Sequence, residues 1–314
     1  MNLTLRIIEV IKEYKYIACL LLLTLCFQKV QAQQAFSYTQ YMHDLVPVNP
    51  AFALTQPQGG VNLVAKKQWV NIKGSPSSVL ANAYLPLGYE SDASAGLMLM
   101  HDNLAVENLS EANAFIAKAI RISETDYLSA SVNFGVRRYA TNYASLDPTD
   151  PVLQDDVNET AGNIGFGVML LGRDEYDENT YFVGVSMPRI SIRGLGSGTP
   201  KENRYFKNQY YITGGFNKYI NDNLIIKPAA LVSYTANLPL QADFSTMFYI
   251  GEAFGAGFNY RTNNEVAAIL SCKIRNAFQI GYSYQTGFGT NKLAGVNNGT
   301  HEIGLSYKFG DNYY

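Results

Sequence analysis

The sequence predicts an all-β fold: a transmembrane antiparallel β-barrel of about fourteen strands, preceded by an N-terminal plug segment. Three observations support it, namely an export signal at the start, alternation of apolar and polar residues along most of the remainder, and long connections on one side of the sheet. The composition agrees, because 314 residues include 23 Tyr, 16 Phe and 26 Gly but only 16% charged residues. Tyrosine is enriched at membrane interfaces, where one end of its ring is dry and the other wet.

Residues 1–32 predict a secretory signal peptide. Basic residues precede an apolar run at Ile17–Phe27, and Val30-Gln31-Ala32 presents small or apolar residues at a cleavage position. The run has 11 residues, and a membrane-spanning helix needs about 20, so a retained anchor is the weaker interpretation. We expect cleavage after Ala32. A lipoprotein signal ending at Cys26 is the alternative, but Leu25 is too large for the position before a modified cysteine.

Cleavage would leave Cys272 as the single cysteine, with 20 basic against 24 acidic residues. A disulfide within the exported chain would then be impossible, so stability must come from burial or from strand closure. A net negative chain is a poor match for a nucleic-acid partner, which usually requires a clustered positive face.

Period-two alternation, the mark of strands with two unlike faces, runs through residues 61–314. In residues 127–137 one face takes Leu128, Ala130, Val132, Phe134 and Val136, and the other takes Tyr127, Ser129, Ser131, Asn133, Gly135 and Arg137. Fourteen strands are predicted, an even number as in bacterial barrels, near 61–70, 77–85, 93–101, 108–121, 126–138, 161–171, 179–188, 205–219, 223–235, 240–249, 253–261, 265–273, 277–285 and 300–310.

The longest predicted connections, 139–160, 189–204 and 286–299, all follow odd-numbered strands. They therefore share one face, which is the extracellular one if both termini are periplasmic. A secreted β-sandwich is the alternative, since its strands alternate too. The polar face here is rich in Gly, Ser and Asn and low in charge, which favours a lumen, with the aromatic face toward lipid.

Residues 33–60 do not fit a strand pattern, because Pro47, Pro50, Pro57 and Gly59-Gly60 interrupt any regular element. The segment is either a disordered periplasmic lead or a plug inside the barrel. Its aromatic and apolar residues favour the plug, since disordered segments normally lack them: Phe36, Tyr38, Tyr41, Met42, Leu45 and Phe52.

Several short motifs occur in a recognisable order along the chain. They are Gln40-Tyr41-Met42 within 38–42, Asn49-Pro50-Ala51 within 48–53, Lys67-Gln68-Trp69-Val70 with Gly74-Ser75-Pro76, Leu146–Pro151, Leu240–Asp243 and His301–Phe309. Together they resemble the PorP/SprF family of type IX secretion system membrane proteins of the Bacteroidetes. The sequence departs from the family pattern at two places. His43-Asp44 stands where an aromatic-Asn pair is usual, and Tyr284-Gln285 stands where Tyr-Asp is usual. These departures leave the partner preference open.

The resemblance implies an outer-membrane barrel that works with other type IX components. It would help to export a secreted adhesin or hold the adhesin's C-terminal domain at the surface for gliding and adhesion. The three long connections would offer a platform for strand-like partner segments. The alternative function is a plugged channel for small hydrophobic solutes, because plugged fourteen-stranded fatty-acid transporters share this architecture. Fold alone does not decide between them.

No motif predicts catalysis, a cofactor or a metal. His43-Asp44 and His101-Asp102 lack the spacing of metal ligands, and a solvated partner loop explains the acidic cluster better than calcium does: Asp147, Asp150, Asp155 and Asp156. Trp69 is expected to anchor the extracellular rim. Its neighbours Lys66, Lys67 and Lys73 are expected to contact lipopolysaccharide phosphates, with an acidic partner as the alternative. Glycines within strands are expected to make room in the lumen or to allow curvature.

Overall fold

The chain divides into two compact units, residues 1–33 and 34–314, and the second unit is described here. The computed structural model describes residues 37–55, 58–70, 72, 74–88, 92–143, 156–173, 179–192, 207–251, 253–275, 277–288 and 299–310. The predicted signal peptide lies outside these residues. Among the residues described, no helix has the length and hydrophobicity to cross a membrane.

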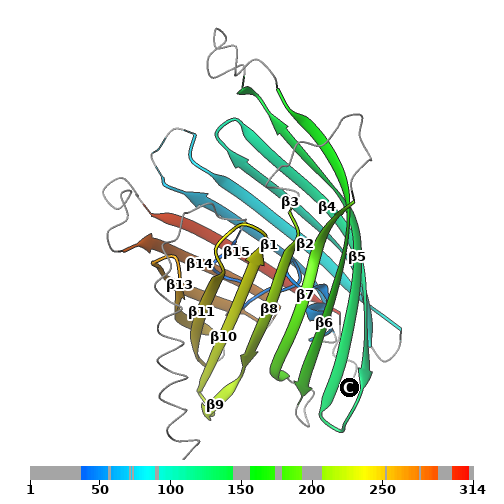
Figure 1. Cartoon of the computed structure of the whole chain (residues 1–314). Helices are drawn as coiled ribbons and strands as arrows, with labels where there is room; N and C mark the ends of the chain where they lie inside the picture. Colours follow the sequence, from blue (N-terminus) through cyan, green and yellow to red (C-terminus); the bar gives the residue numbers. More distant parts are fainter. Residues whose placement is uncertain are drawn as a thin grey trace, which may run out of the picture. The chain divides into compact units, whose positions relative to one another are not determined.

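The second unit is a closed antiparallel barrel of fourteen strands (Figure 1). The first half contains β1 (Gly59–Gln68), β2 (Ser77–Leu87), β3 (Ala93–Leu104), β4 (Glu107–Arg121), β5 (Asp126–Thr141), β6 (Asn158–Arg173) and β7 (Asn179–Ile192). The second half contains β8 (Gln209–Phe216), β9 (Lys218–Asn221), β10 (Leu224–Thr235), β11 (Gln241–Ile250), β12 (Phe254–Arg261), β13 (Glu265–Ile274), β14 (Phe278–Gly287) and β15 (Thr300–Phe309).

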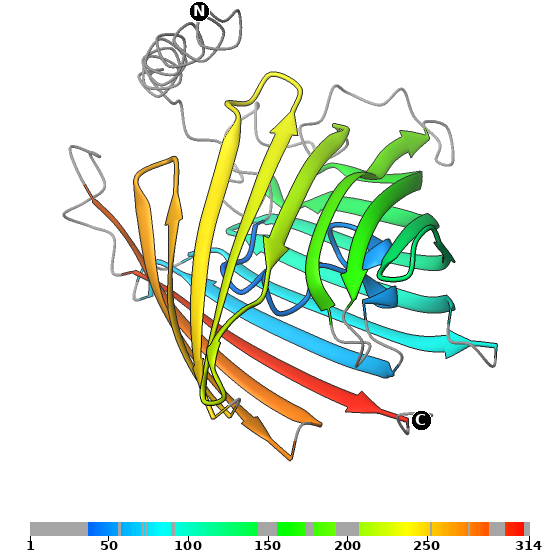
Figure 2. The ribbon, with the colours of Figure 1, turned by 90° about the horizontal axis from the view of Figure 1, so that it is seen from below.

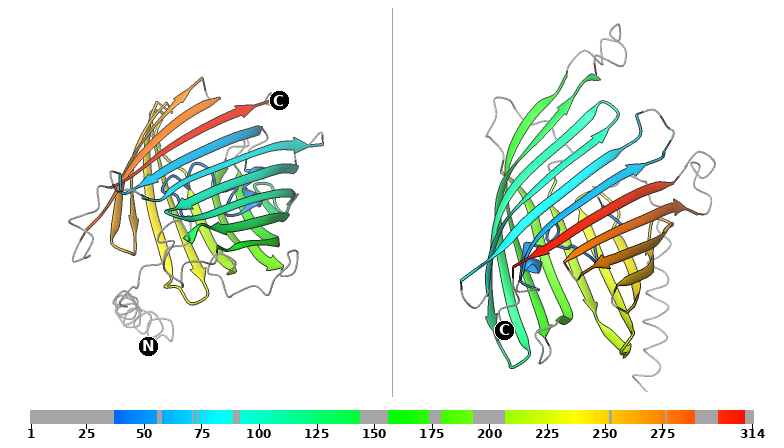
Figure 3. Two further views of the ribbon diagram at one scale, coloured as in Figure 1. Left: turned by 90° about the horizontal axis from the view of Figure 1, so that it is seen from above. Right: turned by 180° about the vertical axis from the view of Figure 1, so that it is seen from behind.

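Fifteen elements make fourteen barrel strands because β8 and β9 both pair with β10 and are separated only by Asn217. The barrel closes through the pairing of β1 with β15, which joins Gly59 to Phe309 and Gln68 to Thr300. The views in Figures 2 and 3 show the strands enclosing a central space. The predicted fold class and number of strands are therefore confirmed.

The side chains alternate between the two faces as the sequence predicted. Leu128 and Phe134 of β5 face outward with 37% and 56% of their surface exposed, whereas Ser129 and Asn133 are fully buried. The same strand buries Arg137 on its inner face. Outward apolar and inward polar residues on one strand are the arrangement of a barrel in lipid, opposite to that of a soluble protein.

The long connections share one end of the barrel. They join β5 to β6, β7 to β8 and β14 to β15, and antiparallel pairing brings all three to the end at which β1 finishes. We call this the long-loop end. At the other end, the short-turn end, β4 and β5 are separated by residues 122–125, and β9 and β10 by residues 222–223.

Residues 37–55, here called the luminal segment, lie inside the barrel (Figure 2). Turns at residues 39–43 and 46–48 carry the chain to the short 3-10 helix η1 (Pro50–Leu54). Asn49 caps this helix, because its side-chain oxygen accepts a hydrogen bond from the backbone N–H of Ala51. Pro50 suits the first helical position, where an N–H would lack an intrahelical partner.

Candidate functional site

The start of the luminal segment is bound to β1 and β15 through charged groups. The carboxylate of Glu302 accepts hydrogen bonds from the backbone N–H groups of Thr39 and Gln40, each at 2.8 Å. Lys66 donates from Nζ to the carbonyl of Ser37 at 2.6 Å. Lys66 and Glu302 pair in register on adjacent strands, so one pair of opposite charges holds the entering chain. Hydrogen bonds to charged groups contribute about 1.5–3 kcal/mol each.

Tyr41 ties the luminal segment to the opposite wall. Its hydroxyl donates toward the carbonyls of Ala229 at 3.0 Å and Asp243 at 3.1 Å, and it accepts from Ser245 Oγ at 3.0 Å. The side chain is fully buried. Met42 is partly buried and packs beside it. The luminal segment therefore contacts β10 and β11 as well as β1 and β15.

Asn49 performs two structural roles. Its Oδ1 caps η1, and its Nδ2 donates to the carbonyls of Val168 at 3.2 Å and Val185 at 3.4 Å. Room for this amide is provided by Gly167, since a Cβ there would lie 2.1 Å from Asn49 Oδ1. The expectation that a strand glycine makes room in the lumen is confirmed at this position.

Apolar packing fills the space between these polar attachments. The rings of Phe52 and Phe182 meet edge to face with centroids 5.6 Å apart. One cluster joins the luminal segment to seven strands through Tyr38, Tyr41, Leu45, Val48, Val64, Leu80, Met100, Leu109, Tyr139, Tyr211 and Leu231. Ala51 and Leu54 pack in a second cluster with Met169 and Leu171.

Two networks of buried ion pairs lie on the inner wall toward the long-loop end. In one, Glu111 contacts Arg189 at 2.9 Å and Arg137 at 3.1 Å. In the other, Arg261 Nε contacts Asp243 Oδ1 at 2.6 Å, with each side chain 1% exposed, and Glu265 lies 3.3 Å from the same guanidinium. Buried charges are tolerated because each is paired, and loss of one partner costs several kcal/mol.

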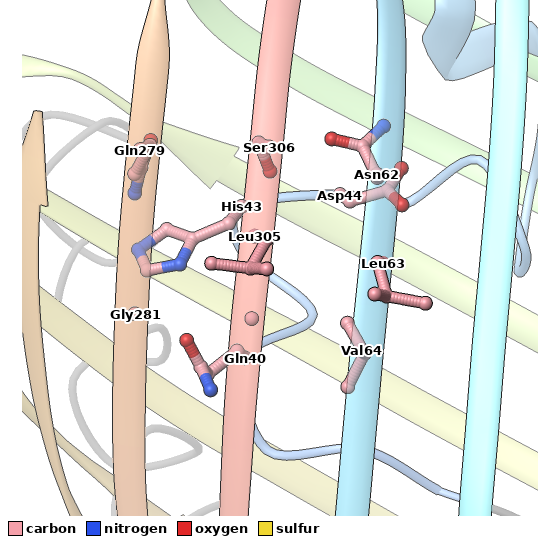
Figure 4. A pocket seen from close by; sticks show the side chains of 11 residues that line it. Gln40, His43, Asp44, Asn62, Leu63, Val64, Gln279, Gly281, Leu305 and Ser306 are labelled. Atoms are coloured by element: carbon pink, nitrogen blue, oxygen red, sulfur yellow. The ribbon is translucent and has the colours of Figure 1, made fainter. Parts of the chain in front are cut away.

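Two small cavities lie between the luminal segment and the barrel wall. One of about 30 Å³ lies between Tyr38 and Val48 of the luminal segment and Arg189, Tyr211 and Leu231 of the wall. Another of about 10 Å³ lies beside Gln40, His43 and Asp44, where they face β1, β14 and β15 (Figure 4). Either volume suits a water molecule rather than an organic solute.

The motif between the first two strands forms a tight turn at the long-loop end. Lys67 Nζ donates to the carbonyl of Ser75 at 2.9 Å, and the N–H of Gln68 donates to the carbonyl of Pro76 at 3.0 Å. Gly74 has φ +76°, which favours glycine, and Trp69 adopts a left-handed φ of 47°. The predicted turn is therefore present.

The expectation that Lys66 contacts lipid phosphates was wrong. Its side chain is 5% exposed and points into the lumen toward Ser37. The alternation of β1 explains this placement: Val61 and Leu63 face outward with 44% and 37% exposure, so Asn62, Val64 and Lys66 face inward. The prediction relied on the proximity of Lys66 to Trp69 in the sequence and ignored the face of β1 on which Lys66 lies.

The candidate partner loop lies mostly outside the described residues, which include only Asp156, an exposed residue, from its acidic cluster. The other three, Asp147, Asp150 and Asp155, are not described. Where the chain is described, no group of three His, Cys, Asp or Glu side chains could hold a metal ion. His43 Nε2 lies 3.0 Å from the hydroxyl of Tyr249, and His101 Nδ1 lies 3.0 Å from Ser110 Oγ.

Sequence reasoning missed the residues that hold the luminal segment and line its walls. The residues share an inward position on alternating strands, which the sequence pattern could have revealed: Glu111, Arg189, Arg261 and Glu302. A charge on the inward face of a membrane strand marks a luminal network.

A closed antiparallel barrel with an apolar exterior and a polar, charge-paired interior defines an outer-membrane β-barrel protein. The model of the type IX secretion system membrane protein family PorP/SprF matches residues 30–307. The chain therefore belongs to the PorP/SprF family, in agreement with the motifs of its sequence. No curated protein matches it.

Solved structures share the fold at low sequence identity. The deltaS2S3 mutant of the TodX monoaromatic hydrocarbon channel has a TM-score of 0.51 and 11% identity, covering 86% of this chain and 94% of that one. The deltaS2 mutant of the same channel also has a TM-score of 0.51 and 11% identity, covering 87% and 95%. The Pseudomonas putida toluene transporter TodX has a TM-score of 0.45 and 12% identity, covering 84% and 93%. At such identities the likeness to the two channel mutants shows the fold alone.

Proposed function

We propose that this chain is a non-enzymatic outer-membrane component of the type IX secretion system that supports export of a secreted adhesin or holds the adhesin's C-terminal domain at the cell surface. After cleavage of residues 1–32, the rest of the chain would lie in the outer membrane. The barrel was expected at residues 61–314, but its first strand begins at Gly59. The long-loop end would face outward, with the C-terminus periplasmic. Membership of the PorP/SprF family supports this role.

The observation that carries the proposal is the packing of the luminal segment against the inner wall. Residues 33–60 would act as a plug, and the described part of this segment is attached to the wall by Glu302, Tyr41 and Asn49. The cavities of about 30 and 10 Å³ beside it are too small for an organic solute. A barrel whose lumen holds a packed segment suits a platform whose function depends on its outer surface.

The alternative, a channel for small hydrophobic solutes, requires an apolar passage beside the plug or through the wall. The luminal segment instead presents buried polar contacts and apolar packing on several strands. The likeness to TodX concerns the fold and carries no solute preference to this chain.

The partner would dock on loops 139–160, 189–204 and 286–299, including the acidic cluster Asp147, Asp150, Asp155 and Asp156. Extended partner segments bind such surfaces through backbone pairing and alternate side chains. The family suggests other secretion components as further partners.

The test is cross-linking in intact cells followed by purification of the full-length chain through an epitope in loop 286–299 and identification of companions by mass spectrometry. Two variants replace residues 144–155 and 193–206, which lie between β5 and β6 and between β7 and β8 and leave all four strands intact, with short turns, and a matched control exchanges turn residues 123–125 at the opposite end. Heat-modifiable migration in gels establishes that each barrel has assembled.

Recovery of one large secreted protein through its C-terminal region, lost in the loop variants and kept in the control, is the expected result. Recovery of the assembled barrel without a secreted companion, together with reduced uptake of a hydrophobic solute when the chain is deleted from cells, would replace the platform with a channel.

A further inference from the structure

The luminal segment has a direction, because its first and last residues contact opposite ends of the barrel. Ser37 is bound by Lys66, which lies two positions before the long-loop end of β1. Leu54 is bound through its carbonyl by Arg173 Nη2 at 2.7 Å. Arg173 is the last residue of β6, at the short-turn end.

The residues in between follow the same direction. Thr39 Oγ1 donates to Gln285 Oε1 at 2.9 Å, and Gln285 pairs with Thr300, the first residue of β15, at the long-loop end. Five positions later, Asp44 accepts a hydrogen bond from Asn82, which pairs with Asn62. Asn62 is three positions from the short-turn end of β1. The chain thus descends along this wall from Thr39 to Asp44.

We infer that the chain enters the lumen from the long-loop end, so that the mature N-terminus lies on the same face of the membrane as the long loops. Under the proposed function this face is the cell surface, and the inference deepens that proposal. This inference differs from the expectation, drawn from the sequence, of a periplasmic N-terminus.

The length of the exported chain supports the inference. The predicted cleavage after Ala32 would leave residues 33–36 before Ser37, and four residues span at most about 14 Å even when fully extended. Lys66, which holds Ser37, is seven positions from Gly59 at the short-turn end, or about 23 Å along the strand. The residues before Ser37 are thus too few to follow the wall to the short-turn end.

The path toward that end is also occupied. Gln40, His43 and Asp44 follow Ser37 in the segment and line a cavity of about 10 Å³ together with residues of β1, β14 and β15. A second chain segment would need to displace them. Gln40 is fixed by Glu302, which accepts from its backbone N–H at 2.8 Å and, through the Glu302 carbonyl, from its Nε2 at 3.3 Å.

The experiment places one short epitope at three positions of the full-length chain expressed with residues 1–32. The positions are between Gln34 and Ala35, between Gly295 and Val296 in a long loop, and between Glu124 and Thr125 in a short turn. Antibody binding is measured on intact cells and again after the outer membrane is permeabilised, and mass spectrometry identifies the mature N-terminus.

Binding of the antibody to the N-terminal and long-loop epitopes in intact cells, with the short-turn epitope detected only after permeabilisation, is the expected result. An N-terminal epitope that behaves like the short-turn epitope would overturn the inference. If the N-terminal and long-loop epitopes were both hidden while the short-turn epitope was exposed, the inference would hold, but the proposed orientation of the barrel would be wrong.

A smaller probe covers the case in which the inserted epitope prevents assembly. Gln34→Cys in a Cys272→Ser background gives a single thiol after cleavage, and a membrane-impermeant maleimide reports its side of the membrane. Glu124→Cys in the same background is the matched control. Labelling of Gln34→Cys but not of Glu124→Cys in intact cells supports entry from the long-loop end. If the loop epitopes are exposed at the cell surface, labelling of Glu124→Cys but not of Gln34→Cys refutes it.

Discussion

Glu302 illustrates how a single inward charge organises the lumen. It accepts from two consecutive backbone N–H groups of the luminal segment and lies beside Lys66 in the β1 register. Alternation along β15 predicted the face of this residue, because Ile303 and Tyr307 carry the outward apolar pattern. Its partners, Thr39 and Gln40, lie more than 260 positions away in the sequence, and local patterns carry no information on such pairs.

The pair Arg261–Asp243 gives a direct test of the buried charges. Arg261→Met leaves the carboxylate of Asp243 buried without its guanidinium, which is expected to lower the free energy of unfolding by about 3–5 kcal/mol. The double variant Asp243→Leu with Arg261→Met removes both charges and is expected to recover most of that loss. The readout is the urea dependence of unfolding in lipid vesicles. Equal losses in the single and double variants would show that the charge pairing is unimportant.

A second residue-scale test concerns the close approach of Asn49 to β6. Gly167→Ala places a Cβ 2.1 Å from Asn49 Oδ1, which cannot move without breaking the cap of η1. Overpacking of this kind costs about 1–3 kcal/mol. Gly214→Ala is the matched control, because its nearest neighbour would lie 3.6 Å away, at ordinary contact distance. Indistinguishable unfolding curves for the two variants would contradict the tight packing of Asn49.

At the scale of elements, alternation was sufficient to predict the strands, because each separates lipid from lumen on its two faces. The strand expected at 223–235 matches β10 at Leu224–Thr235, for example. Alternation did not predict the interruption at Asn217. There β8 and β9 pair with the same strand, β10, and the register shifts between Leu224 and Ile225. Alternation also could not predict how residues 33–60 run, because turns and a 3-10 helix lack the two-residue period of a strand.

The luminal segment itself provides the element-scale prediction. Deletion of residues 38–54 removes the atoms that fill the barrel and exposes the inward polar faces of β6, β11 and β15 to water. The assembled variant is expected to conduct ions in planar bilayers, whereas the complete chain conducts little. The double variant Tyr41→Ala with Asn49→Ala, which keeps the segment but removes its wall attachments, should open intermittently.

Single-channel recording distinguishes these outcomes, with heat-modifiable migration in gels used to select assembled barrels. A complete chain that conducts as strongly as the deletion variant would contradict a sealed lumen. That result would also favour the channel over the surface platform.

At the scale of the whole molecule, the exterior is matched to hydrocarbon. Large apolar side chains with a third or more of their surface exposed occur on strands around the whole barrel, among them Leu97, Phe134, Val185, Ile212, Phe258 and Ile303. Such an area would promote aggregation in water. It also explains why the composition was informative: few charges are needed when lipid covers one face of each strand and a filled lumen covers the other.

A charge placed on this exterior tests the membrane assignment of the whole barrel. Phe134 lies near the middle of β5 with 56% of its surface exposed, so Phe134→Lys would bring an ammonium group to the centre of the bilayer. The expected loss in the free energy of unfolding in vesicles is about 2–4 kcal/mol. Asp222→Lys places the same side chain in the exposed turn between β9 and β10, where a loss below about 1 kcal/mol is expected. Equal stability of both variants would mean that β5 does not face hydrocarbon, and the outer-membrane orientation of every strand in register with it would then be wrong.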